Sequence, residues 1–358
     1  MPSLKEIKGR INSISSTLAI TSAMKMVAAA KLQKAQMAIQ NMLPYERRLH
    51  SMLIDLMGAM NISAAASEDG SVRGSGSAER GFDQSGDRLS LSNRHDLAGM
   101  DGAYSLMAQR EVRKVAIVAF ASNSSLCGAF NSNAIREATA VINEYRASGL
   151  RDSDIVVYSV GRKMAEAMKK LGFPSPADFT KMSDSPSYDA ASALAQELFD
   201  GFVSGRFDKV ELVYNHYKST SSQPTTRQTY LPLSLADATA DLQAGKIADS
   251  ASESDTNRGA EPVGAPVVRQ GSPTTEDLIV EPSKEALIAT LLPKVIRLRI
   301  FTTLLDSAAA EHAARTVAMQ LATDNGNDLL QELTLEYNKG RQQKITSEIL
   351  DLVGGSMQ

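Results

Sequence analysis

Residues 3–18 read SLKEIKGRINSISSTL, and this stretch decides the fold. It opens with Ser3 followed three residues later by Glu6, the capping-box pattern of a helix N-terminus. Large apolar residues then recur at alternating spacings of three and four, which predicts a helix with a coiled-coil seam. The seam residues are Leu4, Ile7, Ile11, Ile14 and Leu18. A long helix with one uncovered apolar stripe is unstable alone, so the pattern predicts a partner helix.

The next stretch, TSAMKMVAAAKLQKAQ at 21–36, keeps strong helix formers but changes the character of the helix. The register reaches Thr21 and then Lys25, where the strict seam is predicted to fail. Small and soft side chains appear there on several faces, unlike the single apolar stripe of an ordinary surface helix. The stretch also carries three lysines, Lys25, Lys31 and Lys34. We expect the helix to reach about residue 60, with a kink or interruption at Pro44.

A second seam of the same kind occupies the C-terminal segment, 277–358. Pro293 predicts a kink near its start, and helical pattern resumes after TDNGND at 323–328. The register runs through Ile288, Leu291, Val295, Leu298, Thr302, Leu305, Ala309, His312, Thr316 and Met319. Pairing the two segments, 1–60 and 277–358, as an antiparallel two-helix coiled coil covers both seams at once.

Between these segments the sequence predicts a Rossmann-like α/β domain over 111–236, so the fold class is α/β with a long coiled coil. Short β-branched runs alternate with helical stretches, which indicates a mostly parallel sheet. The predicted strands are 113–120, 154–161, 209–217 and 225–233. Two further segments, 61–110 and 237–276, are rich in Gly, Ser and charge with few apolar anchors. We interpret both as flexible insertions.

Composition excludes several classes of function. The 358-residue chain carries a formal net charge of −3, whereas nucleic-acid binders are usually basic. Its one cysteine, Cys127, excludes an internal disulfide, and no apolar run predicts a signal peptide or a transmembrane helix. Residues 1–60 are basic, with eight Lys or Arg against three Asp or Glu. They lack the Trp or Phe anchors of a membrane-surface helix, so an acidic protein partner suits them better.

The sequence shows no catalytic, cofactor-binding or metal-binding constellation. The loop SNSSLCGAFNSN (122–133) stands between a strand and a helix, where phosphate loops occur, but lacks the G-x-G-x-x-G and G-K-[ST] spacings. We interpret Cys127 as a buried structural thiol, and the four histidines lack metal-ligand spacing. His312 falls on the seam, where a packed or partner-facing histidine is expected.

Both ends of the chain resemble the gamma subunit of F-type ATP synthases. The resemblance is carried by SLKEIKGRINSISSTLAITSAMKMVAAAKLQKAQ (3–36) and EHAARTVAMQLATDNGNDLLQELTLEYNKGRQQKITSEILDLVGG (311–355). The inner segments SLCGAFNSN, GRKMAEAMKKLGF and LIVEPSKEAL follow in the family's order. The resemblance covers everything except 61–110 and about 237–276. The chain departs from it at 123–125, where Asn-Ser-Ser replaces the usual Asp, basic residue and Gly, so the chemistry of that loop stays open.

This resemblance implies a non-catalytic central-stalk rotor without a cofactor. In the family the coiled coil stands inside a hexamer of alpha and beta subunits, and the α/β domain binds the epsilon subunit and the membrane proteolipid ring. Turning with the ring couples ion flow to ATP synthesis or hydrolysis at beta. The implied location is peripheral, on the cytoplasmic side of the bacterial inner membrane, with membrane association only through the complex. The alternatives are a non-rotary coiled-coil scaffold with an α/β domain and an enzyme built on that domain.

The resemblance also implies which residues touch the moving, acidic segment of beta. On the first helix these are Met24, Lys25 and Lys31. On the C-terminal helix they are Glu311, Arg315, Gln320, Thr323, Asp324 and Asn325. A solvated helix position is the simpler interpretation of each lysine taken alone.

Overall fold

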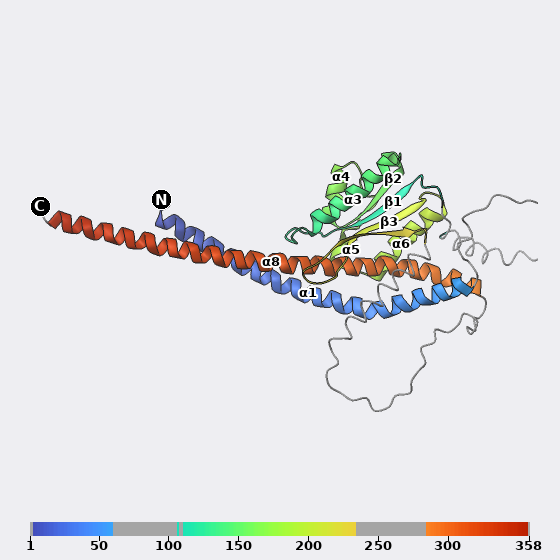
Figure 1. The fold of residues 1–358 in the computed structure, drawn as a ribbon, viewed down its shortest axis with the longest axis horizontal. Coiled ribbons are helices and arrows are strands. Elements are labelled where there is room, and N and C mark those ends of the chain that lie inside the picture. Colours follow the sequence, from blue (N-terminus) through green and yellow to red (C-terminus); the bar gives the residue numbers. More distant parts are fainter. Residues whose placement is uncertain (1–2, 60–105, 107–109, 234–283, 357–358) are drawn as a thin grey trace, which may run out of the picture.

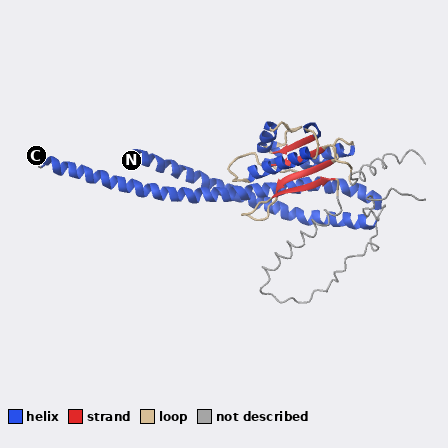
Figure 2. Cartoon of the chain, turned by 45° about the horizontal axis from the view of Figure 1, so that its top comes forward, coloured by secondary structure: helices blue, strands red, loops and turns tan. Residues whose placement is uncertain are grey.

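The structure is a computed structural model, and it describes residues 3–59, 106, 110–233 and 284–356. Two long helices, α1 (Leu4–Ala59) and α8 (Lys284–Ser356), run side by side, and both chain ends lie at the same end of the pair (Figure 1). A four-stranded α/β domain packs on α8 towards the other end (Figure 2). The predicted α/β fold with a long coiled coil is confirmed. The predicted insertions 61–110 and 237–276 lie outside the described residues, except for Leu106 and Arg110.

The two helices, which we call the shaft, are antiparallel. A Cβ added to Gly340 would meet Leu4, and one added to Gly326 would meet Leu18. Further along, Thr302 Oγ1 donates a hydrogen bond to Glu46 at 3.2 Å. Helix α8 continues past the start of α1, and its residues 341–350 are all exposed (Figure 1). One end of the shaft is therefore a single helix.

The seam of α1 does not fail at Lys25, so that prediction is wrong. The heptad register continues to the end of the described side chains, and every member is buried or half-buried. After Leu18 the members are Thr21, Lys25, Ala28, Leu32, Ala35, Ile39, Met42, Glu46, Leu49 and Leu53. Small residues and hydrogen-bonded polar residues occupy seam positions here, so the apolar character lapses while the packing geometry persists.

Both long helices run without interruption through the positions at which a kink or an interruption was expected. Pro44 lies inside α1, and Pro293 and the TDNGND stretch lie inside α8. Pro44 itself is exposed, whereas Met42 and Leu49 on either side of it pack on the core. That packing holds the helix across the missing N–H of proline.

The domain is built on a mostly parallel sheet, as predicted. The strand order is β2-β1-β3-β4, with β1 parallel to both β2 and β3 and with β4 antiparallel to β3. The strands are β1 (Val115–Phe120), β2 (Ile155–Val160), β3 (Lys209–Asn215) and β4 (Thr225–Leu231). Each lies within its predicted range.

Helices cover both faces of the sheet, which explains why β1 is apolar throughout. Side chains of Val115, Ile117 and Ala119 pack under α3 (Phe130–Ala147) and α4 (Arg162–Lys170). The alternate side chains of β1 face α6 (Tyr188–Val203) and α8. A 3-10 turn, Asp152–Asp154, and the short α5 (Thr180–Asp184) complete the domain. Because Leu292, Val295 and Ile296 of α8 join this core, one helix belongs to both the shaft and the domain.

Candidate functional site

Four of the nine predicted contact residues lie together in a polar band across the shaft. Lys25 Nζ donates to Gln320 Oε1 at 2.7 Å, and Gln320 Nε2 donates to the Asp324 carboxylate at 2.8 and 3.0 Å. One turn away, the hydroxyls of Thr21 and Thr323 lie 3.0 Å apart. The band therefore links α1 to α8 through hydrogen bonds where the seam loses its large apolar residues.

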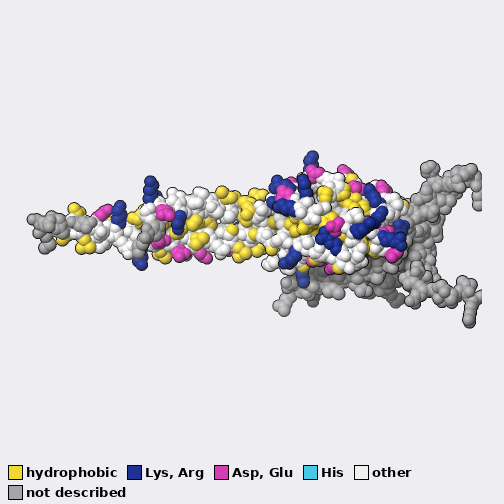
Figure 3. Space-filling view, turned by 90° about the horizontal axis from the view of Figure 1, so that it is seen from above, with side chains coloured by type: hydrophobic (Ala, Val, Ile, Leu, Met, Phe, Trp, Pro, Cys, Tyr) yellow, Lys and Arg dark blue, Asp and Glu magenta, His cyan; other side chains and the backbone are white. Residues whose placement is uncertain are grey.

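The band is open to solvent, and a partner protein could reach it. Gln320, Asp324 and the neighbouring Asn325 are exposed, while Met24 and Lys25 are half-buried. Lys31 lies further along α1 and is exposed. In a space-filling view, the middle of the shaft shows mostly apolar and uncharged side chains, whereas charged side chains gather over the α/β domain (Figure 3).

Glu311 and Arg315, the other two predicted contact residues, lie at the junction of shaft and domain. Their side chains form an ion pair at 2.7 Å and are only 10% and 11% exposed. Arg315 also donates to Ser124 Oγ at 2.6 Å, which ties α8 to the loop that follows β1. Burial raises the pKa of Glu311 above its ordinary value, against the opposing charge of Arg315. The pair braces the shaft on the domain.

His312 is packed at the seam, as expected for that position. Its Nδ1 is buried and meets no hydrogen-bond partner within the ranges that the structure describes. Burial and the charges of Arg315 and Lys31 lower the pKa of His312 to about 4. The imidazole is therefore neutral near pH 7.

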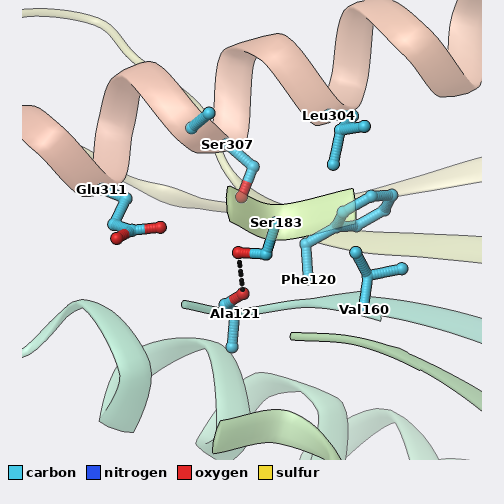
Figure 4. A pocket seen from close by; sticks show the side chains of 8 residues that line it. Phe120, Ala121, Val160, Ser183, Leu304, Ser307 and Glu311 are labelled. Carbon is cyan, nitrogen blue, oxygen red and sulfur yellow. Dashed lines mark hydrogen bonds between the residues drawn. The ribbon is translucent and has the colours of Figure 1, made fainter. Parts of the chain in front are cut away.

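The edge of the sheet at which α/β folds hold ligands is closed by α8. Ligands bind beyond the carboxyl ends of the strands in such sheets. Here Phe120 and Val160, at the ends of β1 and β2, face Leu304, Ser307 and Glu311 of α8 (Figure 4). The space left between them is about 10 Å³, and Ser183 Oγ beside it donates to the carbonyl of Ala121 at 3.0 Å. Such a cavity holds at most about one water molecule.

A larger cleft of about 230 Å³ lies at the opposite, amino-terminal ends of β1 and β2. It is lined by both signs of charge, including Lys114, Asp154, Glu197 and Arg206. Glu197 is already engaged, because it accepts a hydrogen bond from Tyr158 Oη at 2.9 Å. The predicted burial of Cys127 is confirmed, since that residue is 1% exposed.

Sequence reasoning missed two sets of residues at the shaft. Gly326 and Gly340 occupy seam positions of α8, and counting the heptad on from Met319 would have identified both. Tyr217, Gln36 and Asp306 join the domain to the two helices through hydrogen bonds. No local pattern predicts those contacts, because they join residues far apart in the sequence.

None of the described helices has the length and apolarity needed to cross a membrane.

Comparison with known proteins agrees with this architecture. A family model described as ATP synthase matches residues 3–357. The ATP synthase gamma chain of Phocaeicola vulgatus is 47% identical over 357 residues, and that of Bacteroides thetaiotaomicron is 45% identical over 358, with full coverage of both chains in each case. A chain of the Euglena gracilis mitochondrial ATP synthase, solved as OSCP/F1/c-ring in rotational state 3, has a TM-score of 0.52 at 18% identity. It covers 99% of this chain and 93% of its own length, and it shares the fold. This chain belongs to the ATP synthase gamma chain family.

Proposed function

We propose that this chain is the central-stalk rotor of an ATP synthase. It turns inside a hexamer of alpha and beta subunits and couples ion flow through the membrane proteolipid ring to ATP synthesis or hydrolysis at beta. The observation that carries this proposal is the continuity of α8. This 73-residue helix is about 110 Å long at ~1.5 Å per residue, and it is part of both the domain core and the shaft.

Continuity of α8 gives a direct route for torque. A force applied to the α/β domain acts on Leu292, Val295 and Ile296 of α8. Because α8 is unbroken, that force reaches the shaft through covalent bonds and helix hydrogen bonds. The shaft is asymmetric, since α1 and α8 present different side chains and α8 extends alone at one end (Figure 1). Rotation of an asymmetric element biases the surrounding sites in turn.

We assign the contacts with the moving segment of beta to six of the nine predicted residues, four of them exposed and two, Met24 and Lys25, half-buried. Lys25 and Lys31 supply positive charge towards an acidic segment, and Gln320, Asp324 and Asn325 supply hydrogen bonds beside them. Met24 adds an adaptable apolar side chain. Glu311 and Arg315 act indirectly, by holding the junction at which the shaft meets the domain.

The chain itself performs no chemistry in this proposal. The closing of the carboxyl edge of the sheet by α8 supports that assignment, because a nucleotide has no space there. We place the α/β domain against the epsilon subunit and the proteolipid ring, on the cytoplasmic side of a bacterial inner membrane. The chain is peripheral there and is held through the complex.

Capture from solubilised membranes tests the proposal. Lys170 is exposed on α4, away from the shaft, so Lys170→Cys provides a site for biotin. We expect the biotinylated chain to retain alpha, beta and epsilon subunits together with the ring protein, and the chain without the added cysteine serves as the control. Recovery without alpha and beta would contradict the rotor and favour a scaffold. ATP hydrolysis by the purified chain alone would favour an enzyme.

A further inference from the structure

The connection between β3 and β4 touches both helices of the shaft. Tyr217 stands in this connection, and its hydroxyl accepts a hydrogen bond from Gln36 Nε2 of α1 at 2.6 Å. Its backbone N–H donates to Asp306 Oδ1 of α8 at 2.9 Å. A single residue of the domain therefore binds α1 through its side chain and α8 through its backbone.

The ring of Tyr217 is packed as well as hydrogen-bonded. It lies against a shaft cluster formed by Leu32, Ala309 and Ala313. It also lies against a second cluster, in which Cys127 and Phe130 of the domain meet Ala310 of α8. The ring fills the place where the domain and the two helices come together, and small alanines on α8 make room for it.

The neighbouring His216 makes the second contact with the same carboxylate. Its Nδ1 lies 2.6 Å from Asp306 Oδ2, so the two oxygens of Asp306 engage two consecutive residues of the connection. The backbone N–H of His216 donates to the carbonyl of Pro224 at 2.9 Å, which closes the connection on itself. Asp306 is only 17% exposed in its side chain, so its interactions are partly shielded from solvent.

We propose that His216 and Tyr217 form a latch on Asp306 that transmits torque between the α/β domain and the shaft, and that protonation of His216 tightens it. The torque part of this inference rests on the proposed function. The latch differs from the Glu311–Arg315 brace because a histidine gives it a dependence on pH.

The sign of the pH dependence follows from the charges around the imidazole. Within the described residues, the charged groups that act on His216 are Asp306 of α8 and Lys218 of the same connection. The hydrogen bond to Asp306 raises the pKa of His216, while burial and Lys218 oppose it. Because the pKa of His216 is higher in the folded chain, the extra stability is fully present at pH below about 6.5, the pKa of a histidine in the unfolded chain. It is lost as pH rises through the higher pKa of His216 in the folded chain.

The pH part is tested on the full chain by thermal unfolding of the wild type and His216→Gln between pH 5.5 and 9. We expect the variant to melt about 2–4 °C below the wild type at pH 5.5, and the gap to shrink by at least half at pH 9. His312→Gln is the contrasting variant: because burial lowers the pKa of His312 to about 4 in the folded chain, the wild type loses stability relative to this variant as pH falls through the unfolded pKa of about 6.5, which is the opposite sense to His216→Gln. A gap for His216→Gln that is the same at every pH would overturn the proton-dependent latch.

The torque part is tested in the assembled complex with Asp306→Ala, which removes both latch contacts. We expect ATP-driven ion pumping per ATP hydrolysed to fall at least two-fold, while ATP hydrolysis and subunit composition stay unchanged. Asp306→Asn keeps an acceptor for the Tyr217 N–H. Its ion pumping per ATP hydrolysed should therefore lie between that of the wild type and that of Asp306→Ala. Unchanged pumping in Asp306→Ala would overturn the torque role. Failure of the chain to capture alpha and beta would instead overturn the proposed function, and the unfolding test would still stand.

Discussion

Leu18 of α1 lies directly against Gly326 of α8, and a Cβ added to that glycine would be 2.6 Å from Leu18 Cδ2. The same pairing recurs two heptads away, where a Cβ on Gly340 would be 3.2 Å from Leu4 Cδ2. Leucine on one helix thus packs onto glycine on the other in this part of the shaft. Glycine is unfavourable inside a helix, so the packing compensates for a local cost.

Replacing Gly326 by alanine should therefore give less than the usual gain from this substitution, because Leu18 must shift to make room for the methyl group. Gly→Ala in a helix ordinarily stabilises by about 0.5–1 kcal/mol, whereas overpacking offsets part of that gain. We expect Gly326→Ala to raise the Tm of the full chain by less than a Gly→Ala change at an open helix position does. Gly9→Ala is the matched control, because a Cβ there meets nothing within 4 Å and should raise Tm. Equal increases in Tm for both variants would contradict the close contact between Leu18 and Gly326.

A buried ion network in the domain predicts a large effect at Glu211. This carboxylate is 1% exposed and is bound by Arg227 at 2.7 Å, by Lys209 at 2.7 Å and by the hydroxyl of Tyr145 at 2.6 Å. Glu211→Gln leaves the two cations without their shared partner, so we expect a loss of about 3–5 kcal/mol in the free energy of unfolding. Glu166→Gln, which breaks only exposed pairs, should change little.

The same carboxylate predicts how stability depends on acid. Burial alone would raise the pKa of Glu211, but hydrogen bonds from Arg227, Lys209 and Tyr145 prevail and lower it. The stability that ionised Glu211 contributes is therefore present at pH above about 4.3, the pKa of a glutamate in the unfolded chain. It is lost as pH falls through the lower pKa that Glu211 has in the folded chain. The free energies of unfolding of the wild type and Glu211→Gln should therefore approach each other as pH falls below about 4. A difference that stays constant from pH 7 to pH 3 would show that the charge is not the cause.

Leu106 falls inside the range predicted as an insertion, yet it belongs to the domain. It is 0% exposed, packs in the core with Leu198 and Phe202, and its carbonyl accepts from the N–H of Leu233 at 2.9 Å. Leu106→Ala should cost about 2–5 kcal/mol, measured by denaturant unfolding. Leu171→Ala, at an exposed leucine, provides the comparison. A loss no greater than that of Leu171→Ala would mean that Leu106 adds nothing to the core.

Sequence alone predicted the elements of this fold wherever apolar residues mark the packing. Large apolar residues at Leu4 to Leu18 established one seam, and β-branched runs established all four strands. The prediction failed at Lys25 because hydrogen bonds there replace apolar contacts. A hydrophobic pattern cannot reveal that Lys25 meets Gln320 or that Thr21 meets Thr323.

Contact of the nine predicted residues with beta stays a prediction, but part of the set lies together on the shaft. Lys25, Gln320, Thr323 and Asp324 do lie together, because the antiparallel register brings them to one level of the shaft. Arg315 instead points to Ser124, 191 residues away in the chain, and Tyr217 reaches Gln36 across 181 residues. Such contacts depend on how α8 packs on the sheet, which no local pattern encodes.

The lysines of α1 should matter for coupling rather than for assembly. Replacing Lys25, Lys31 and Lys34 together by Gln removes the positive charge that we propose acts on an acidic segment of beta, while the seam residues Ala28 and Leu32 stay in place. We expect fewer ions pumped per ATP hydrolysed in membrane vesicles, with normal subunit composition. A control triple, Lys169, Lys170 and Lys181→Gln, removes the same charge from the exposed surface of the domain. If both triple variants pump the same number of ions per ATP hydrolysed, the three shaft lysines are ordinary solvent-exposed side chains without a role in coupling.

Rotation itself is the most direct test of the central claim. The hexamer is fixed to a surface in complex with the Lys170→Cys chain, and a probe is attached at that cysteine on α4, while Cys127 stays buried. When ATP is added, we predict that the probe turns in one direction in steps that follow ATP hydrolysis. Steady ATP hydrolysis with a stationary probe would contradict the account, because it would show that this chain does not rotate with catalysis.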